Sequence, residues 1–305
     1  MKIALVSIGK IARDQHLPAI AASPDWELAA TVSRTATVAG VEGFPTLGEM
    51  LAARPDIGAV SLCMPPSARF APAAEAIRAG RHVMLEKPPG ATLSECVTLE
   101  RMAHAAGVSL FATWHSRMAG QVARAADWLC GRRILRVGVV WTEDVRRWHP
   151  GQEWIWQPGG LGVFDPGINA LSILTRILPV PLHVTRAVLD FPANRATPIA
   201  ADLTFHAGPG AEARAVFDWR EEGPQTWDIT VGTTDGCLVL RDGGARLEID
   251  GVPCEAAVSE EYPALYARMA GLVAAGESDV DLAPMMLVAD AFTLGVRRQV
   301  AAFDW

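Results

Sequence analysis

The segment Lys2-Ile3-Ala4-Leu5-Val6-Ser7-Ile8-Gly9-Lys10-Ile11-Ala12 predicts how the first third of this 305-residue chain folds. Its apolar run predicts a buried strand, and the turn at Gly9 leads into a helical pattern. Four more short apolar runs follow, separated by segments of helical periodicity, at residues 27–32, 59–63, 82–85 and 108–112. This alternation predicts an α/β domain, a Rossmann doubly wound parallel sheet.

The pattern changes near Arg117, where we expect a second domain. An amphipathic helix to Leu129 precedes a Trp-rich and Gly-rich loop, a helix after Asp165, and alternating strands at residues 135–143, 182–191, 200–206, 213–219, 227–233 and 237–240. These features predict an α+β domain built on a mostly antiparallel open sheet. We therefore divide the chain into residues 1–116 and 117–305, with a helix at 285–302 as the candidate to return to the first domain. We expect a homo-oligomer, a dimer, formed through the C-terminal sheet.

Composition and charge exclude several classes of partner. The formal net charge of −7 disfavours nucleic acid and anionic membranes, which need a basic surface, and leaves small neutral substrates. No apolar run is long enough to span a bilayer, and the N-terminal run lacks a signal-peptide cleavage pattern, so we expect a cytoplasmic protein. The five cysteines show no close spacing typical of a zinc or redox motif, and we expect no metal.

The turn after the first strand predicts a dinucleotide site. Gly9 takes the second glycine place of the fingerprint and Ala12 the third, whereas Ser7 replaces the first. The central glycine allows the backbone to approach a pyrophosphate at the helix N-terminus. The residues expected to bind the cofactor here are Ser7, Ile8, Gly9, Lys10 and Ile11. An ordinary strand-to-helix turn is the alternative interpretation.

The end of the second strand predicts which cofactor is preferred. It carries Ser33 and Arg34 where an NAD enzyme usually offers a carboxylate to the ribose hydroxyls. A hydroxyl and a guanidinium suit a 2′-phosphate, so NADP is favoured and NAD is the second choice. A solvated surface arginine is the alternative. The rigid loop with Cys63, Pro65 and Pro66 suits a position beside the ribose or nicotinamide, or is simply a stiff turn.

Two further segments carry candidate chemistry. Val83-Met84-Leu85-Glu86-Lys87-Pro88-Pro89 ends an apolar strand on a lysine, which then faces the crevice where parallel sheets bind ligands. In Gly159–Asn169, the pattern predicts Asp165 as a helix cap and Pro166 as the first helical residue. Asn169 then lies one turn later. A solvated loop lysine and a purely structural cap are the alternatives.

The fingerprint, the Glu86-Lys87-Pro88 segment and the Gly159–Asn169 segment together resemble the glucose-fructose oxidoreductase/inositol dehydrogenase (Gfo/Idh/MocA) family, across essentially the whole chain. Residues 143–152 and 162–173 look similar to the members of that family that act on L-arabinose and D-galactose. The resemblance implies oxidation of the anomeric carbon of a pyranose to an aldonolactone. Glu86 and Lys87 are then expected at the cofactor, and Lys87, Asp165 and Asn169 as the catalytic residues.

One position departs from the family pattern, because Asn169 stands where a histidine is common. An amide cannot accept a proton at neutral pH, so the resemblance leaves Asp165 as the base, with Asn169 orienting the sugar and Lys87 binding the C1 hydroxyl. Tryptophan faces and polar edges suit a sugar. The expected substrate-binding residues are His115, Glu143, Trp148, His149 and Trp227.

Two other functions remain open at this point. One is a sugar or dinucleotide sensor that uses the same fold without catalysis. The other is a family dehydrogenase that acts on an inositol or a ketone. Retention of Lys87, Asp165 and Asn169 favours the enzyme.

Overall fold

The computed structural model describes all 305 residues, which form two compact units. The first contains Met1–His115 and Glu261–Leu282, and the second contains Ser116–Glu260 and Ala283–Trp305. The break after His115 lies beside the predicted one. The segment that returns to the first unit is Glu261–Leu282, however, and not the predicted 285–302.

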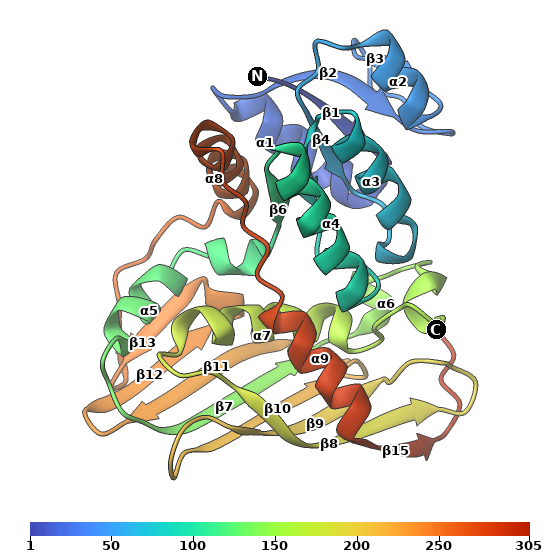
Figure 1. Cartoon of the computed structure of the whole chain (residues 1–305). Coiled ribbons are helices and arrows are strands. Elements are labelled where there is room, and N and C mark those ends of the chain that lie inside the picture. The colour runs from blue at the N-terminus through green and yellow to red at the C-terminus, as the bar shows by residue number, and fades with distance from the viewer. The chain divides into compact units, whose positions relative to one another are not determined.

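The first unit is built on a six-stranded parallel sheet with the order β3-β2-β1-β4-β5-β6 (Figure 1). Its strands are β1 Lys2–Val6, β2 Glu27–Val32, β3 Glu42–Phe44, β4 Ala59–Leu62, β5 His82–Leu85 and β6 Leu110–Ala112. This order confirms the doubly wound sheet, and its winding reverses between β1 and β4, where such sheets bind ligands. The strand missed by the sequence analysis, β3, has three residues and no fully buried one.

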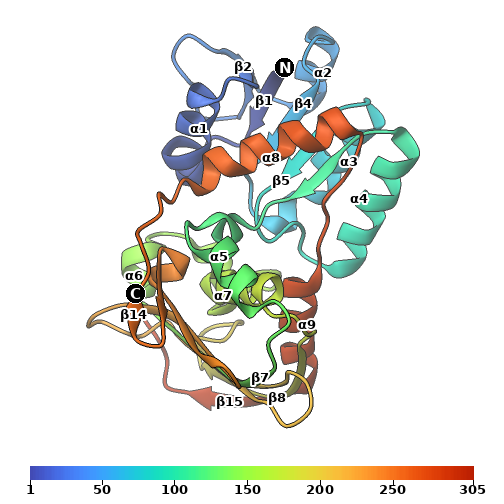
Figure 2. The same cartoon turned by 90° about the vertical axis from the view of Figure 1, so that its left-hand side faces the viewer.

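Helices cover both faces of this sheet. On one face lie α2 Leu47–Ala53, α3 Phe70–Arg78 and α4 Leu93–Ala106, and on the other lie α1 Leu17–Ala22 and α8 Glu261–Ala275 (Figure 2). Helix α8 buries Leu265, Met269 and Leu272, spaced three and four residues apart as expected for one helix face. The indole Nε1 of Trp26 also donates to the Tyr266 carbonyl at 2.9 Å. These contacts explain why a segment so late in the chain belongs to the first unit.

The second unit is built on a nine-stranded sheet with the order β14-β13-β12-β11-β7-β10-β9-β8-β15. Its strands are β7 Ile134–Thr142, β8 His183–Pro192, β9 Ala200–His206, β10 Glu212–Asp218, β11 Thr226–Thr233, β12 Gly236–Arg241, β13 Arg246–Ile249, β14 Val252–Pro253 and β15 Gly295–Val300. All neighbouring pairs are antiparallel except β7 with β10 and β8 with β15. This confirms the mostly antiparallel open sheet.

Helices cover only one face of that sheet. They are α5 Val122–Leu129, α7 Phe164–Ile177 and α9 Ala283–Leu294 (Figure 1). A short helix, α6 Val145–Trp148, follows β7. The opposite face carries ion pairs, such as Arg241 with Asp228 at 2.7 Å and Arg298 with Asp190 at 2.6 Å, beside the 45 % exposed Val140.

The end of the chain differs from the predicted helix at 285–302. Helix α9 ends at Leu294, and Gly295–Val300 continues as an edge strand parallel to β8. A Cβ at Gly295 would come within 2.4 Å of the Ala291 carbonyl, so only glycine fits at this change of direction. The strand then places Arg298 on Asp190. No helix of the chain is long and apolar enough to cross a bilayer.

Candidate functional site

The turn after β1 has the backbone geometry of a dinucleotide fingerprint. Ser7 has a φ of 72°, so it adopts the left-handed conformation that the usual first glycine provides without strain. A Cβ at Gly9 would meet no atom within 4 Å, so this part of the backbone faces open space. Lys10 and Ile11 open the following helix. The residues present therefore fit an approaching pyrophosphate.

The loop after β2 offers donors without a carboxylate. The Ser33 hydroxyl accepts the Ala36 N–H at 3.2 Å, which shapes the turn, and Arg34 is exposed and makes no hydrogen bond or ion pair. Arg13 reaches the same loop by donating to the Thr37 carbonyl at 3.4 Å. This second cation was not singled out in the sequence, because nothing in the pattern shows that the fingerprint helix reaches residue 37.

A buried arginine that the sequence analysis missed joins the loops after β4 and β5. Arg69 is 2 % exposed, and its guanidinium donates to the carbonyls of Met64, Glu86 and Pro88. These carbonyls belong to the predicted Cys63–Pro66 loop and to the Lys87 segment, whose Lys87–Pro88 peptide is cis. Arg69 thus fixes both predicted cofactor loops relative to each other.

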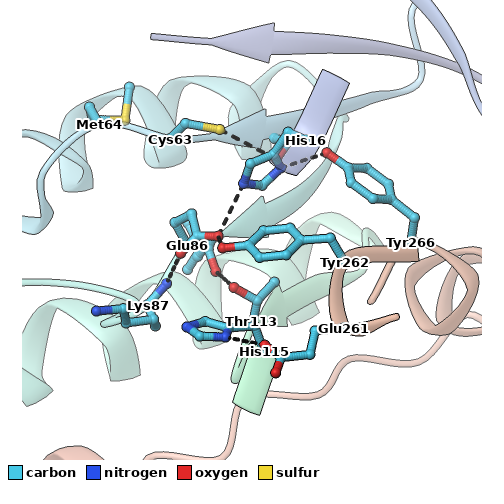
Figure 3. Close-up of polar contacts among 12 residues, drawn as sticks. His16, Cys63, Met64, Glu86, Lys87, Thr113, His115, Glu261, Tyr262 and Tyr266 are labelled. Atoms are coloured by element: carbon cyan, nitrogen blue, oxygen red, sulfur yellow. Dashed lines mark hydrogen bonds and ion pairs between the residues drawn. The ribbon is translucent and has the colours of Figure 1, made fainter. Parts of the chain in front are cut away.

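Glu86 lies in a buried network that fills both of its carboxylate oxygens (Figure 3). Oε1 accepts from Tyr262 at 2.8 Å and pairs with His16 Nε2 at 3.0 Å, while Oε2 accepts the Lys87 backbone N–H at 2.8 Å. The other ring nitrogen of His16 contacts the Tyr266 hydroxyl at 2.7 Å. The side chain expected at the cofactor is therefore held by protein donors and fixes the backbone of Lys87.

Opposing effects set the protonation of this pair. Burial acts to lower the pKa of His16, but Cys63, Tyr266 and Glu86 outweigh it and raise that pKa well above the usual value. Burial likewise acts to raise the pKa of Glu86, but the contacts with His16 dominate and lower it to about 2. At neutral pH the two groups form an imidazolium–carboxylate ion pair. His16 lies at the end of a π-helical turn, Ala12–His16, and the sequence analysis did not identify it.

His115 belongs to the first unit and lies beside the same network (Figure 3). Its Nδ1 pairs with Glu261 Oε2 at 2.6 Å, and its ring stacks on Tyr262 with centroids 5.7 Å apart. Both partners come from α8. His115 thus belongs to the first unit, whereas the other predicted substrate-binding residues belong to the second.

In the second unit, Glu143 follows β7 and is 5 % exposed. It accepts from two indoles, Trp227 Nε1 at 2.8 Å and Trp219 Nε1 at 3.2 Å. Trp148 packs edge-to-face on Trp227 with ring centroids 5.3 Å apart. The structure therefore brings the predicted Glu143, Trp148 and Trp227 together. The buried Trp219 joins them. No sequence pattern marks it as a site residue, because a buried tryptophan is most often a core residue.

His149 lies between two buried carboxylates. Its Nε2 is 3.7 Å from Glu143 Oε1, and its Nδ1 is 3.7 Å from Asp165 Oδ2. Both distances are too long for hydrogen bonds, and Nδ1 makes none. Its position just after α6 places the ring against Trp219, with centroids 5.2 Å apart.

Asp165 is not the predicted helix cap. Helix α7 begins at Phe164, its cap residue Val163 makes no side-chain cap bond, and Asp165 lies in the first turn. The glycines before it allow this entry, because a Cβ at Gly162, whose φ is +55°, would come within 2.3 Å of the Pro198 carbonyl. Asn169 follows Asp165 one turn later on the same helix.

Comparisons with known proteins identify the family and the fold of the chain. Residues 1–113 match the family model described as an oxidoreductase family with an NAD-binding Rossmann fold. Galactose 1-dehydrogenase of Pseudomonas fluorescens is 44 % identical over 304 residues, which cover 99 % of this chain and 98 % of that protein. The crystal structure of D-galactose-1-dehydrogenase from Rhizobium etli is 56 % identical, with a TM-score of 0.96, over 99 % of this chain and 97 % of that one.

A more distant structure shows the fold alone. The 3-ketoreductase KijD10 of Actinomadura kijaniata, in complex with NADP and TDP-benzene, is 21 % identical with a TM-score of 0.86, over 98 % of this chain and 99 % of that one. The two galactose 1-dehydrogenases match nearly the complete chain. Together with the strand order and the fingerprint turn, this match places the whole chain in one family. The chain belongs to the Gfo/Idh/MocA family of oxidoreductases, which has an NAD-binding Rossmann fold.

Proposed function

We propose that this protein is an NADP-dependent aldose 1-dehydrogenase that oxidises the anomeric carbon of D-galactose to the lactone, with L-arabinose and D-fucose as further substrates. The observation that carries the proposal is the Glu143, Trp227, His149 and Asp165 cluster. It combines indole faces with buried hydrogen-bonding groups, as sugar sites do. The similarity to two galactose 1-dehydrogenases supports the same substrate.

In this proposal Asp165 accepts the proton of the C1 hydroxyl, Lys87 hydrogen-bonds the oxygen of that hydroxyl, and Asn169 orients the sugar. Asp165 is suited to the role of base because it is a buried carboxylate in the first turn of α7, beside the ring of His149. The Asn169 side chain, which makes no hydrogen bond within the chain, has an amide that donates and accepts. When bound, the cofactor accepts the hydride from C1.

The cofactor preference rests on the loop after β2. Arg34 is exposed and unpaired, and Ser33 lies beside it, where a carboxylate would serve NAD. The open space over Gly9 suits the pyrophosphate, and the loop of Cys63, Pro65 and Pro66 suits the nicotinamide ribose. Because protein donors fill both oxygens of Glu86, we propose that this residue acts on the cofactor site only through the backbone of Lys87.

The decisive experiment measures cofactor reduction at 340 nm with NADP and NAD against D-galactose, L-arabinose, D-fucose, D-glucose and D-xylose. We expect turnover with the first three sugars, which share the configuration of the ring hydroxyls, and preference for NADP. D-Glucose inverts the C4 hydroxyl and leaves buried polar groups unpaired, which lowers kcat/KM about fivefold to more than a hundredfold. Equal efficiency on D-glucose and D-galactose would refute the narrow substrate assignment.

The same panel separates the other functions. A sensor binds the sugar or the dinucleotide and reduces no cofactor. An inositol or ketone dehydrogenase reduces cofactor with its own substrate and forms no lactone from any aldose.

We also propose that two copies associate through the uncovered face of the nine-stranded sheet, where Val140 lies among ion pairs. Light scattering after size exclusion measures the mass in solution. Val140→Asp places a charge on this face and is expected to shift the protein to a monomer, whereas Val258→Asp changes another exposed valine and serves as the control. A monomeric wild type contradicts this proposal.

A further inference from the structure

The environment of His149 points to a role beyond contact with the sugar. Its side chain is 14 % exposed and lies between the side chains of Glu143 and Asp165, which are 6 % and 5 % exposed. Each of its ring nitrogens is 3.7 Å from one of these carboxylates. An imidazole in this position can exchange a proton with Asp165 on one side and be stabilised by Glu143 on the other.

Glu143 supports this arrangement because the two side chains that donate hydrogen bonds to it are neutral indoles. Trp219 and Trp227 donate indole N–H groups to it, and His149 is the only basic side chain paired with it. A buried carboxylate favours a nearby cation. Glu143 therefore places a buried carboxylate at one ring nitrogen of His149, while Asp165 lies at the other.

The backbone holds the imidazole in place. The His149 N–H donates to the Val145 carbonyl at 2.9 Å, and the Gln152 N–H donates to the His149 carbonyl at 3.2 Å. The ring packs on Trp219. Nδ1 is nevertheless buried without a hydrogen-bond partner, and it is the ring nitrogen that faces Asp165.

We infer that His149 is a proton-relay residue that takes from Asp165 the proton released by the sugar; the inference rests on the proposed function. A buried base must lose its proton before the next turnover. Asn169, one turn along α7, cannot accept it because an amide is not basic at neutral pH. The imidazole beside Asp165 comes instead from the loop after α6.

The steps balance as follows. The O1–H bond breaks, the proton binds Asp165, and the electron pair of the C1–H bond leaves with the hydride to the NADP of the proposed function as C1=O forms. The proton then leaves Asp165, an N–H bond forms at Nδ1 of His149, and Asp165 returns to its carboxylate form. His149 finally releases one proton to water. The 3.7 Å separation must shorten by under about 1 Å, as is common when substrate binds.

The test is His149→Ala assayed with and without added imidazole, which can occupy the space left by the side chain. We expect kcat with D-galactose to fall roughly 100-fold, at the low end of acid–base contributions. Imidazole should restore it in a saturable manner, and the Kd for D-galactose, measured by tryptophan fluorescence, should change less than about threefold. His206→Ala removes an exposed imidazole from the same unit and should leave all three quantities unchanged.

Two variants keep the test decisive. His149→Asn provides a similar shape without a basic nitrogen, so its kcat should fall as far as that of His149→Ala. It carries the test if the alanine variant folds poorly. In His149→Ala/Asp165→Asn, imidazole should restore nothing, because the group that hands over the proton is gone. A wild-type kcat in His149→Asn, or a raised KM at unchanged kcat in His149→Ala, overturns the relay and leaves His149 as a sugar contact. Absence of any sugar-dependent cofactor reduction in the wild type refutes the proposed function instead.

Discussion

Each unit contains a histidine beside a buried carboxylate, and the two clusters differ in how closely their atoms approach. In the first unit, His16 and Glu86 are 3.0 Å apart, and protein donors fill both oxygens of Glu86. In the second unit, His149 is 3.7 Å from both Glu143 and Asp165, and its Nδ1 makes no hydrogen bond. A fully paired cluster stabilises a fold, whereas a loosely paired one retains capacity to bind a ligand or move a proton.

The largest effect is expected at the loosely paired cluster. Asp165→Asn should lower turnover by roughly two to four orders of magnitude, because the amide keeps the shape of the side chain but cannot accept a proton. Its melting temperature, measured alongside, should stay near that of the wild type because the amide has the same shape as the carboxylate. Turnover near the wild-type value would show that Asp165 is not the base.

The next largest effect is on the stability of the first unit. Glu86 ionises at a pKa of about 2 in the folded state against an ordinary value of 4.5, so its ionisation stabilises the fold by on the order of 3 kcal/mol above pH 4.5. This contribution is lost as the pH falls from 4.5 toward 2. The raised pKa of His16 adds a second contribution, which is fully present below about pH 6.5 and is lost as the pH rises through the folded value.

Glu86→Gln should abolish the first pH dependence and weaken the second, because Cys63 and Tyr266 also raise the pKa of His16. Hydrogen exchange of β5 peptides, followed across the pH range, measures the effect, and peptides from β9 in the second unit provide the internal control. Glu143→Gln is the matched variant. It should weaken D-galactose binding while destabilising its unit less, because the donors to Glu143 are neutral indoles. Equal destabilisation by the two substitutions contradicts the comparison between the clusters.

A smaller effect is expected at the unpaired cation Arg34. Arg34→Ala should raise the KM for NADP about tenfold or more, since a charge-assisted hydrogen bond contributes roughly 1.5–3 kcal/mol, while the KM for NAD changes little. Arg54→Ala is the control, because Arg54 is already paired with Asp56 and Glu42. A rise of the same size for both cofactors would show that Arg34 only supports the loop.

The smallest effect is expected at the fingerprint turn. Ser7 has a φ of 72°, and Ser7→Gly should stabilise the first unit by at most about 1 kcal/mol by removing strain in the left-handed conformation. Thermal unfolding measures the change. Ser23→Gly, at a residue with a φ of −80°, should show no such gain in stability. An equal gain there would show that backbone strain at Ser7 is not the cause.

The features that depend on local pattern could be predicted from the amino-acid sequence alone. Five of the six strands of the first sheet lie within two residues of the expected bounds, because each is a short apolar run between turns. The fingerprint turn, the loop after β2 and the stretch before α7 were predicted for the same reason. The expected helix at 285–302 was wrong at the end of the chain. The close approach at Gly295 ends the helix, and Gly295–Val300 pairs at the edge of the sheet as β15.

Contacts between residues far apart in sequence could not be predicted, because they depend on how the elements pack. His16 and Tyr266 lie 250 residues apart in sequence, and the packing of α8 on the first unit brings them into contact. Arg69 and Trp219 were missed because a buried arginine or tryptophan carries no local signal of its partners. His149 was predicted as a sugar contact, but its place between Glu143 and Asp165 depends on three separate elements of the second unit. A sequence pattern encodes which face of an element is buried, whereas the pairing of polar side chains is set by how the elements pack.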